Sequence, residues 1–215
     1  MNPSQRTRDF LLTIARCSLV EDQFLNPSLA QPCRGVITAQ APLQRDSHQV
    51  PEPWSGRLES ASVLFFGSNP SINPVEVFPT ETWSDDDIVD FFGNRFGGGR
   101  QEWVKRLHVL RNDGTHGPAK KWVRFWAACR GRATELLGRQ AVDGVDFAIA
   151  EAVHCKSKGE QDAGEAVTEL AARTCADRYI RAVVDLSPAR AIVSFGGIAL
   201  ASSLLVRVAE RVPFS

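Results

Sequence analysis

The sequence predicts a single α/β domain with a mostly parallel central sheet, and three short apolar runs carry that prediction. These runs are residues 62–66 (Ser-Val-Leu-Phe-Phe), 145–153 and 191–195 (Ala-Ile-Val-Ser-Phe), and the first and last are each followed by glycine. Short apolar runs of this kind are typical of strands buried on both faces of a parallel sheet. Segments with helical patterning lie between them, and strands that alternate with helices pair in parallel through right-handed crossovers.

The first 60 residues are expected to belong to this same domain. An amphipathic helix is predicted over 5–16, because Phe10, Leu11 and Ile14 recur at helical spacing. Residues 18–60 are rich in Pro, Ser and Gln and are expected to be irregular. A loop of that length is usually functional or wrapped on a core. The α/β unit itself is placed over 61–215.

The remaining helices are predicted from caps and breakers. Ser84 precedes three aspartates, so it can cap a helix whose positive end the acids favour, and this helix should run to about Phe92. Gly97-Gly98-Gly99 then interrupts the chain. Further helices are expected over 101–111, 120–137, 165–186 and 198–210.

Composition limits the possible partners. The chain has 215 residues, 43% of them hydrophobic, which suits one domain with a substantial core. Lys+Arg and Asp+Glu both number 25, so the net charge does not by itself indicate a nucleic-acid partner, although a local basic groove remains compatible with it. No segment has the apolar length of a membrane span, and the N-terminus lacks a signal-peptide pattern. We therefore expect a cytoplasmic monomer with no membrane association.

The loop Gly67-Ser68-Asn69-Pro70-Ser71 is the first candidate site. It follows the first apolar strand directly, and ligands of open α/β sheets bind beyond the carboxyl ends of the strands. The loops after Phe66, Val153 and Phe195 should therefore converge on one site. Asn69 offers both a hydrogen-bond donor and an acceptor. The alternative is an ordinary strand-to-helix turn, in which Asn and Pro are also common.

This loop resembles the first motif of the uracil-DNA glycosylase superfamily, which reads Gly-x-Asn-Pro in some branches. Phe78-Pro79 follows at a distance similar to that of the family's base-stacking Phe, and Asn94-Arg95-Phe96 is similar to a stretch of the mismatch-specific branch. The segment 151–155 (Glu-Ala-Val-His-Cys) and the segment 175–196 resemble motifs of the iron–sulfur branch. The resemblance covers about residues 60–205.

The resemblance implies a three-layer α/β/α sandwich and an enzyme that removes a damaged or deaminated, uracil-type base from DNA. Such an enzyme flips the nucleotide into a pocket and hydrolyses its N-glycosidic bond. Asn69 would orient the attacking water, and Phe78 would stack on the base. Glu151 stands where the family reads the base edge, and Gly67, Ser68, Pro70 and Ser71 would complete the base pocket. Lys156 and Lys158 are candidates for DNA phosphate contacts.

Two departures from the family keep other functions open. A carboxylate at Glu151 accepts but does not donate hydrogen bonds unless it is protonated, so uracil need not be the preferred base. Alternatively, Glu151 is only a charge at the sheet rim. The family's final His-Pro-Ser motif is absent, so either the chain is a fragment or the site is incomplete. The rival functions are a non-catalytic nucleic-acid-binding module on this fold and an unrelated nucleotide or sugar hydrolase.

Four cysteines are candidate ligands of an iron–sulfur cluster. Cys17 and Cys33 precede the Asn69 loop, and Cys155 and Cys175 follow the second strand, which is the order found in the iron–sulfur branch. Four thiolates suit a [4Fe–4S] cluster. The alternative is that all four are buried thiols, since free cysteine is a good core residue. Cys129, which lies on a predicted helix, is expected to be a core residue.

A group of basic residues near the glycine run forms a second candidate surface. Interleaved Trp103, Trp122 and Trp126 would anchor phosphate binding there. The alternative is a solvated helix face over a Trp core. The basic residues concerned are Arg95, Arg100, Lys105, Arg106, Arg111, Lys120, Lys121, Arg124, Arg130 and Arg132.

Overall fold

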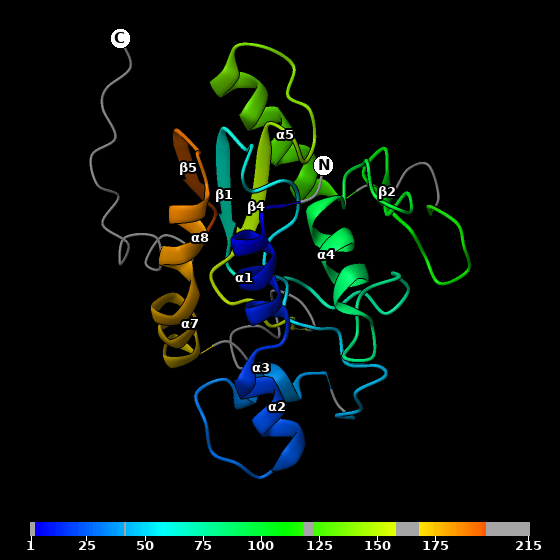
Figure 1. The fold of residues 1–215 in the computed structure, drawn as a ribbon, viewed down its shortest axis with the longest axis vertical. Helices are drawn as coiled ribbons and strands as arrows, with labels where there is room; N and C mark the ends of the chain where they lie inside the picture. Colours follow the sequence, from blue (N-terminus) through cyan, green and yellow to red (C-terminus); the bar gives the residue numbers. More distant parts are fainter. Residues whose placement is uncertain (1–2, 41, 118–122, 158–167, 197–215) are drawn as a thin grey trace.

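The computed structural model describes residues 3–40, 42–117, 123–157 and 168–196 (Figure 1). At its centre lies a three-stranded sheet made of β1 (Val63–Gly67), β4 (Phe147–Glu151) and β5 (Ala191–Ser194). The strand order is β4-β1-β5 and both pairings are parallel, with Gly67 opposite Glu151 and Phe66 opposite Ser194. The prediction of an α/β fold with a parallel sheet is therefore confirmed.

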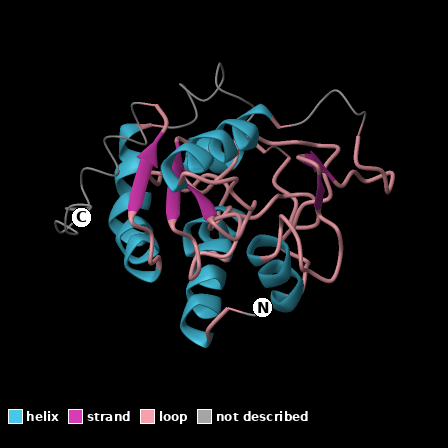
Figure 2. Cartoon of the chain, turned by 90° about the horizontal axis from the view of Figure 1, so that it is seen from above, coloured by secondary structure: helices cyan, strands magenta, loops and turns pink. Residues whose placement is uncertain are grey.

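The two faces of the sheet pack against separate apolar clusters. Side chains alternate along a strand, so Leu64 and Phe66 of β1 point to one face, and Val63 and Phe65 to the other. Figure 2 shows helices on both sides of the three strands. On the Leu64 face lie α1 (Gln5–Ala15), α4 (Asp85–Gly93), α7 (Glu169–Cys175), the π-helical turn η1 (Ala176–Ile180) and α8 (Arg181–Leu186). On the Phe65 face lies α5 (Arg124–Leu137).

Local sequence signals account for several of these elements. The Ser84 hydroxyl accepts a hydrogen bond from the Asp87 amide at the start of α4, with three aspartates in the first turn, as predicted. Gly138 ends α5 in the left-handed conformation that favours glycine. The predicted helix over 165–186 is confirmed from residue 169 onward as three consecutive helical segments. The predicted helix over 198–210 lies outside the described residues.

Two predictions of secondary structure are wrong. Residues 18–60 are not irregular throughout, because they contain α2 (Ser18–Leu25) and α3 (Arg34–Thr38). Residues 101–111 do not form a helix but an antiparallel hairpin, β2 (Val104–Lys105) and β3 (His108–Val109). Arg106 and Leu107 at its tip have positive φ angles of 50° and 65°. Most apolar side chains of this segment are still buried, but the hairpin places them in the core instead of one face of a helix.

The N-terminal segment belongs to the core of the sheet. Leu11 and Ile14 of α1 and Val20 of α2 lie in the same apolar cluster as Leu64 and Phe66. Among the described residues, no helix is both long and apolar enough to span a membrane.

Candidate functional site

A cavity of about 720 Å³ opens at the carboxyl edge of the sheet. The loops after β1, β4 and β5 all reach it, so the predicted convergence of these three loops is confirmed. Five of its lining residues come from the predicted loop, namely Gly67, Ser68, Asn69, Pro70 and Ser71. The rest are Glu52, Asn73, Glu76, Arg95, Val109, Val123, Phe125, Trp126, Glu151, Lys156, Phe195 and Gly196.

Asn69 is held in place because the loop after β1 continues to pair with the chain after β4. The amides of Ala152 and Val153 donate to the carbonyl oxygens of Gly67 and Ser68. Beyond these, the Ser157 amide donates to the Pro70 carbonyl at 3.1 Å. The Asn69 side-chain Nδ2 donates to Ser157 Oγ at 2.7 Å, which sets the orientation of the amide. No hydrogen bond from the described residues occupies Asn69 Oδ1, so this oxygen remains able to accept one.

Glu151 lies directly across from Gly67, and the absence of a side chain on Gly67 makes room for it. A Cβ on Gly67 would stand 2.8 Å from Glu151 Cδ, well inside van der Waals contact. Glu151 is buried, and none of the described residues hydrogen-bonds to its Oε2. Burial raises the pKa of Glu151 well above its usual range, and the Glu52 carboxylate raises it further, while Lys156 and Arg95 offset only part of this. These surroundings favour the neutral form of Glu151, in which the carboxyl group can donate a hydrogen bond.

Arg95 is the centre of a buried ion cluster beside Glu151. Its guanidinium donates to Glu52 Oε1 at 2.9 Å and to Glu76 Oε1 at 2.5 Å. It also donates to Ser55 Oγ at 3.0 Å, and its plane lies over Trp126. Burial alone would raise the pKa of Glu52, but attraction to Arg95 and Lys156 leaves it below its usual value, so Glu52 is ionised. Arg95 was considered above as a surface phosphate contact, and that interpretation is wrong because both of its amino groups pair inward.

Lys156 lies inside the molecule, where it lines the cavity. Its ammonium stands 3.4 Å from the centroid of the Phe78 ring and 3.9 Å from Glu52 Oε2. Burial lowers the pKa of Lys156 to about 8, against the opposing attraction of Glu52 and Glu76. A phosphate could meet this amine only from within the cavity, not on the outer surface. Lys158, the second predicted phosphate contact, lies outside the described residues.

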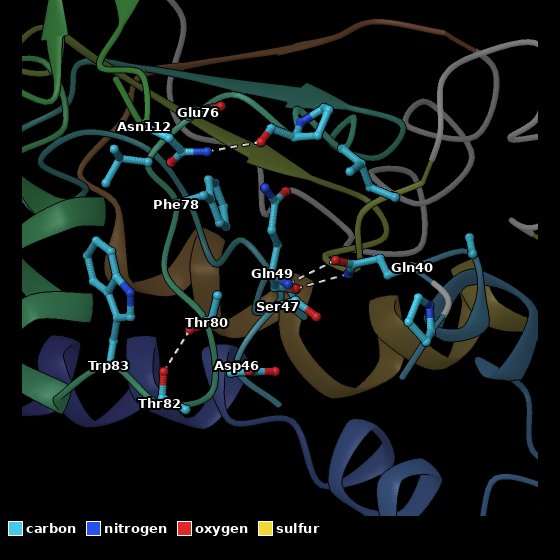
Figure 3. A pocket seen from close by; sticks show the side chains of 15 residues that line it. Gln40, Asp46, Ser47, Gln49, Glu76, Phe78, Thr80, Thr82, Trp83 and Asn112 are labelled. Atoms are coloured by element: carbon cyan, nitrogen blue, oxygen red, sulfur yellow. Dashed lines mark hydrogen bonds between the residues drawn. The ribbon is translucent and has the colours of Figure 1, made fainter. Parts of the chain in front are cut away.

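Phe78, the predicted base-stacking residue, lines a different cavity. Lys156 covers one face of its ring, and Phe91 and Phe92 contact it edge-on. The second cavity, of about 620 Å³, adjoins the first through Glu76, which lines both. Figure 3 shows Phe78, Trp83 and Gln49 around it, with the Gln40 amide bonded to the backbone of Gln49. The aromatic side chains that do line the Asn69 cavity are Phe125, Trp126 and Phe195.

The four predicted cluster ligands lie close enough together to interact electrostatically, below the Leu64 face of the sheet. Cys17 and Cys33 precede the first residues of α2 and α3, Cys155 follows β4, and Cys175 ends α7. All four are buried and reduced. The neighbouring Cys33 thiol and burial raise the pKa of Cys175, and burial, Cys175 and Cys17 raise the pKa of Cys155. The Tyr179 hydroxyl donates to Cys17 Sγ at 3.2 Å.

These cysteines differ from a site for one metal ion. Within the described ranges, no group of three or more Cys, His, Asp or Glu side chains is arranged to hold a single ion. A [4Fe–4S] cluster binds each thiolate through a different iron, so its four sulfurs stand farther apart than the ligands of one ion. The four thiols come from distant parts of the chain and lie in one buried apolar cluster. Cys129 lies apart, in the core under α5, as predicted.

The predicted basic surface is largely neutralised by neighbouring acids. Arg100 pairs with Asp87, Lys105 with Glu102, and Arg130 with Asp143. Trp103 and Trp126 are buried, which confirms the interpretation of a Trp core for these two residues. Lys120, Lys121 and Trp122 lie outside the described residues.

Sequence reasoning missed Glu52 and Glu76, the two acids that hold Arg95. They stand 43 and 19 residues from it in the chain, and no local pattern connects them. The sequence offered one signal for Glu52, which is a charged residue between Pro51 and Pro53 in a segment otherwise poor in charge.

No protein-family model matches this chain, and no curated protein matches it either. The functional conclusion therefore depends on the residues of the site.

Proposed function

We propose that this chain is a DNA glycosylase that removes a damaged or deaminated base by hydrolysis of the N-glycosidic bond, on a three-layer α/β/α fold of the uracil-DNA glycosylase type. The observation that carries the proposal is the fixed amide of Asn69 at the carboxyl edge of the sheet. Ser157 holds its Nδ2 and leaves Oδ1 to accept a hydrogen bond from water. The cavity that Asn69 lines has a volume of about 720 Å³, enough for a flipped nucleoside.

Asn69 would act by orientation. Its Oδ1 would accept a hydrogen bond from the water and direct the water oxygen at the sugar C1′. An amide does not take up the proton as a carboxylate does, so this residue supplies positioning rather than strong base catalysis. Backbone amides near Ser68 would stabilise the charge that develops on the departing base.

Base release is the direct test. Oligonucleotides with one uracil or one hypoxanthine, single- and double-stranded, are incubated with the wild-type chain, Asn69→Ala, Asn69→Asp and the control Asn26→Ala, which changes an exposed asparagine. Asn69→Ala should slow release by about 100-fold, since it removes the group that positions the water. Asn69→Asp should retain release or accelerate it, because a carboxylate can also accept the proton.

Two other outcomes would support the rival functions. If wild-type protein binds oligonucleotides but releases no base from any of them, the chain is a binding module. If it binds free nucleotides but not oligonucleotides, it acts on nucleotides. Release that is unchanged in Asn69→Ala would remove Asn69 from the mechanism.

We also propose that Cys17, Cys33, Cys155 and Cys175 hold a [4Fe–4S] cluster. A bound cluster would link the segments before α2 and α3 to the end of α7 and to the chain after β4, and would so stabilise the fold on this side of the sheet. The Tyr179 hydroxyl donates to Cys17 Sγ, and hydrogen bonds to the sulfurs are one way in which proteins tune such clusters. Iron and sulfide are measured after anaerobic purification. Cys33→Ser should lose both, and Cys129→Ser should retain both. Wild-type protein without iron would leave the four as buried thiols.

A further inference from the structure

We propose that Glu151 is the catalytic acid that protonates the departing base, so that this site prefers purine bases, such as deaminated purines in DNA, to uracil. This inference rests on the proposed function and adds the class of base. Glu151 lines the same cavity as Asn69, and it belongs to β4, the strand that pairs with β1 just before the Asn69 loop.

The geometry commits the Glu151 carboxyl group to this cavity. Gly67 opposite has no side chain, and any Cβ there would collide with the carboxyl. Along β4, Phe147 and Ile149 point to the same face and are fully packed, so Glu151 is the first residue of that row to reach the cavity. The acid is therefore presented at the sheet edge by a rigid strand and not by a loop.

The charges around Glu151 favour its neutral form. Facing it are Glu52 from the segment before β1, Arg95 after α4, Lys156 after β4 and Cys129 of α5. Both cations already have anionic partners: Arg95 pairs with Glu52 and Glu76, and Lys156 lies near Glu52. Burial raises the pKa of the Cys129 thiol to about 12, so this group stays neutral and adds no charge beside Glu151. A carboxylate at Glu151 would be a third buried negative charge beside two positive ones, which is costly.

The reaction balances with water as the only co-reactant. The C1′–N9 bond of the nucleotide breaks and its electron pair goes to the purine. The Glu151 carboxyl gives its proton to N7 of the purine, which leaves as a neutral base. The water positioned by Asn69 forms the new C1′–O bond, and the proton that it loses restores the Glu151 acid. The products are the free base and an abasic sugar.

The two kinds of base differ in what they gain from an acid. N7 of a purine carries a lone pair outside the Watson–Crick edge, and protonation there converts the purine into a better leaving group. Uracil in a nucleotide has no such ring nitrogen and leaves as an anion spread over its two carbonyl groups, which needs hydrogen-bond donors rather than a proton. A buried acid therefore accelerates purine release more than uracil release.

The experiment compares hypoxanthine with uracil in otherwise identical oligonucleotides, using wild-type protein and Glu151→Gln. A glutamine amide has nearly the same shape and still donates and accepts hydrogen bonds, but it cannot transfer a proton. Hypoxanthine release should fall by about 100-fold or more in Glu151→Gln, and by a larger factor than uracil release falls. Binding of an oligonucleotide with a non-hydrolysable 2′-fluoro inosine should be retained, which shows that the variant is folded.

The pH profile of base release provides a second readout. Wild-type hypoxanthine release should decline as the pH rises and Glu151 loses its proton, and Glu151→Gln should lack this decline. Faster release of uracil than of hypoxanthine by wild-type protein, or hypoxanthine release that is unchanged in Glu151→Gln, would overturn the inference while leaving the glycosylase intact. Release of neither base would instead refute the proposed function.

Discussion

Replacing Glu151 by glutamine should change the pH dependence of stability in a defined direction. The ordinary pKa of a glutamate is 4.5, and the folded chain raises it well above that value. The contribution of the Glu151 proton to the free energy of unfolding is fully present below about pH 4.5. It is lost as the pH rises towards the folded pKa, because between the two pKa values the unfolded state gives up the proton and the folded state keeps it. Each pH unit in the window lowers the free energy of unfolding by about 1.4 kcal/mol.

The magnitude follows from the pH interval. If Glu151 keeps its proton throughout, raising the pH from 5.5 to 7.5 costs the wild-type chain about 2.7 kcal/mol that the Glu151→Gln variant does not lose. The buried amide adds a cost of its own, but that cost does not change with pH. The variant should therefore become steadily more stable relative to wild type as the pH rises.

Urea unfolding at pH 5.5, 6.5 and 7.5 measures this difference. Glu169→Gln, at the exposed start of α7, is the matched control and should follow the wild-type curve at every pH. Parallel curves for wild type and Glu151→Gln would mean that Glu151 is ionised in the fold, and the reasoning from its burial would be refuted.

Three further predictions concern the frame around the site. Arg95→Met should destabilise the fold by about 3–5 kcal/mol at pH 7, because it leaves Glu52 and Glu76 as buried acids without their main partner. Urea unfolding would show this, and a loss below about 1 kcal/mol would mean that the pair is solvated. Ser84→Ala should cost about 1 kcal/mol through the lost cap of α4, whereas Ser84→Asp should retain stability. Arg106→Asn should stabilise the hairpin by a few tenths to about 1 kcal/mol, since asparagine tolerates the positive φ angle at that position. An unchanged melting temperature would argue against strain there.

Local signals were sufficient where the cause of the structure is local. The cap at Ser84 and the apolar run of β1 depend on neighbouring residues, and both were predicted. The segment 101–111 shows the limit of such signals. The spacing of Trp103, Leu107 and Leu110 suits a helix, but a hairpin buries the same side chains. Periodicity records which residues are buried, not how the chain turns between them.

The sequence by itself determined the order of the strands along the chain, the loop that carries Asn69, and four cysteines worth considering together. Strand runs and turn residues are encoded over a few positions, and parallel topology then brings the strand ends to one edge. Only the tertiary structure decided that Arg95 lies inside, that Lys156 covers Phe78, and that Glu151 is a buried acid whose pKa is raised. Each of these depends on desolvation and on charges supplied by distant segments. The pKa of an ionisable side chain depends on its burial and on the charges around it, and both are set only when the chain has folded.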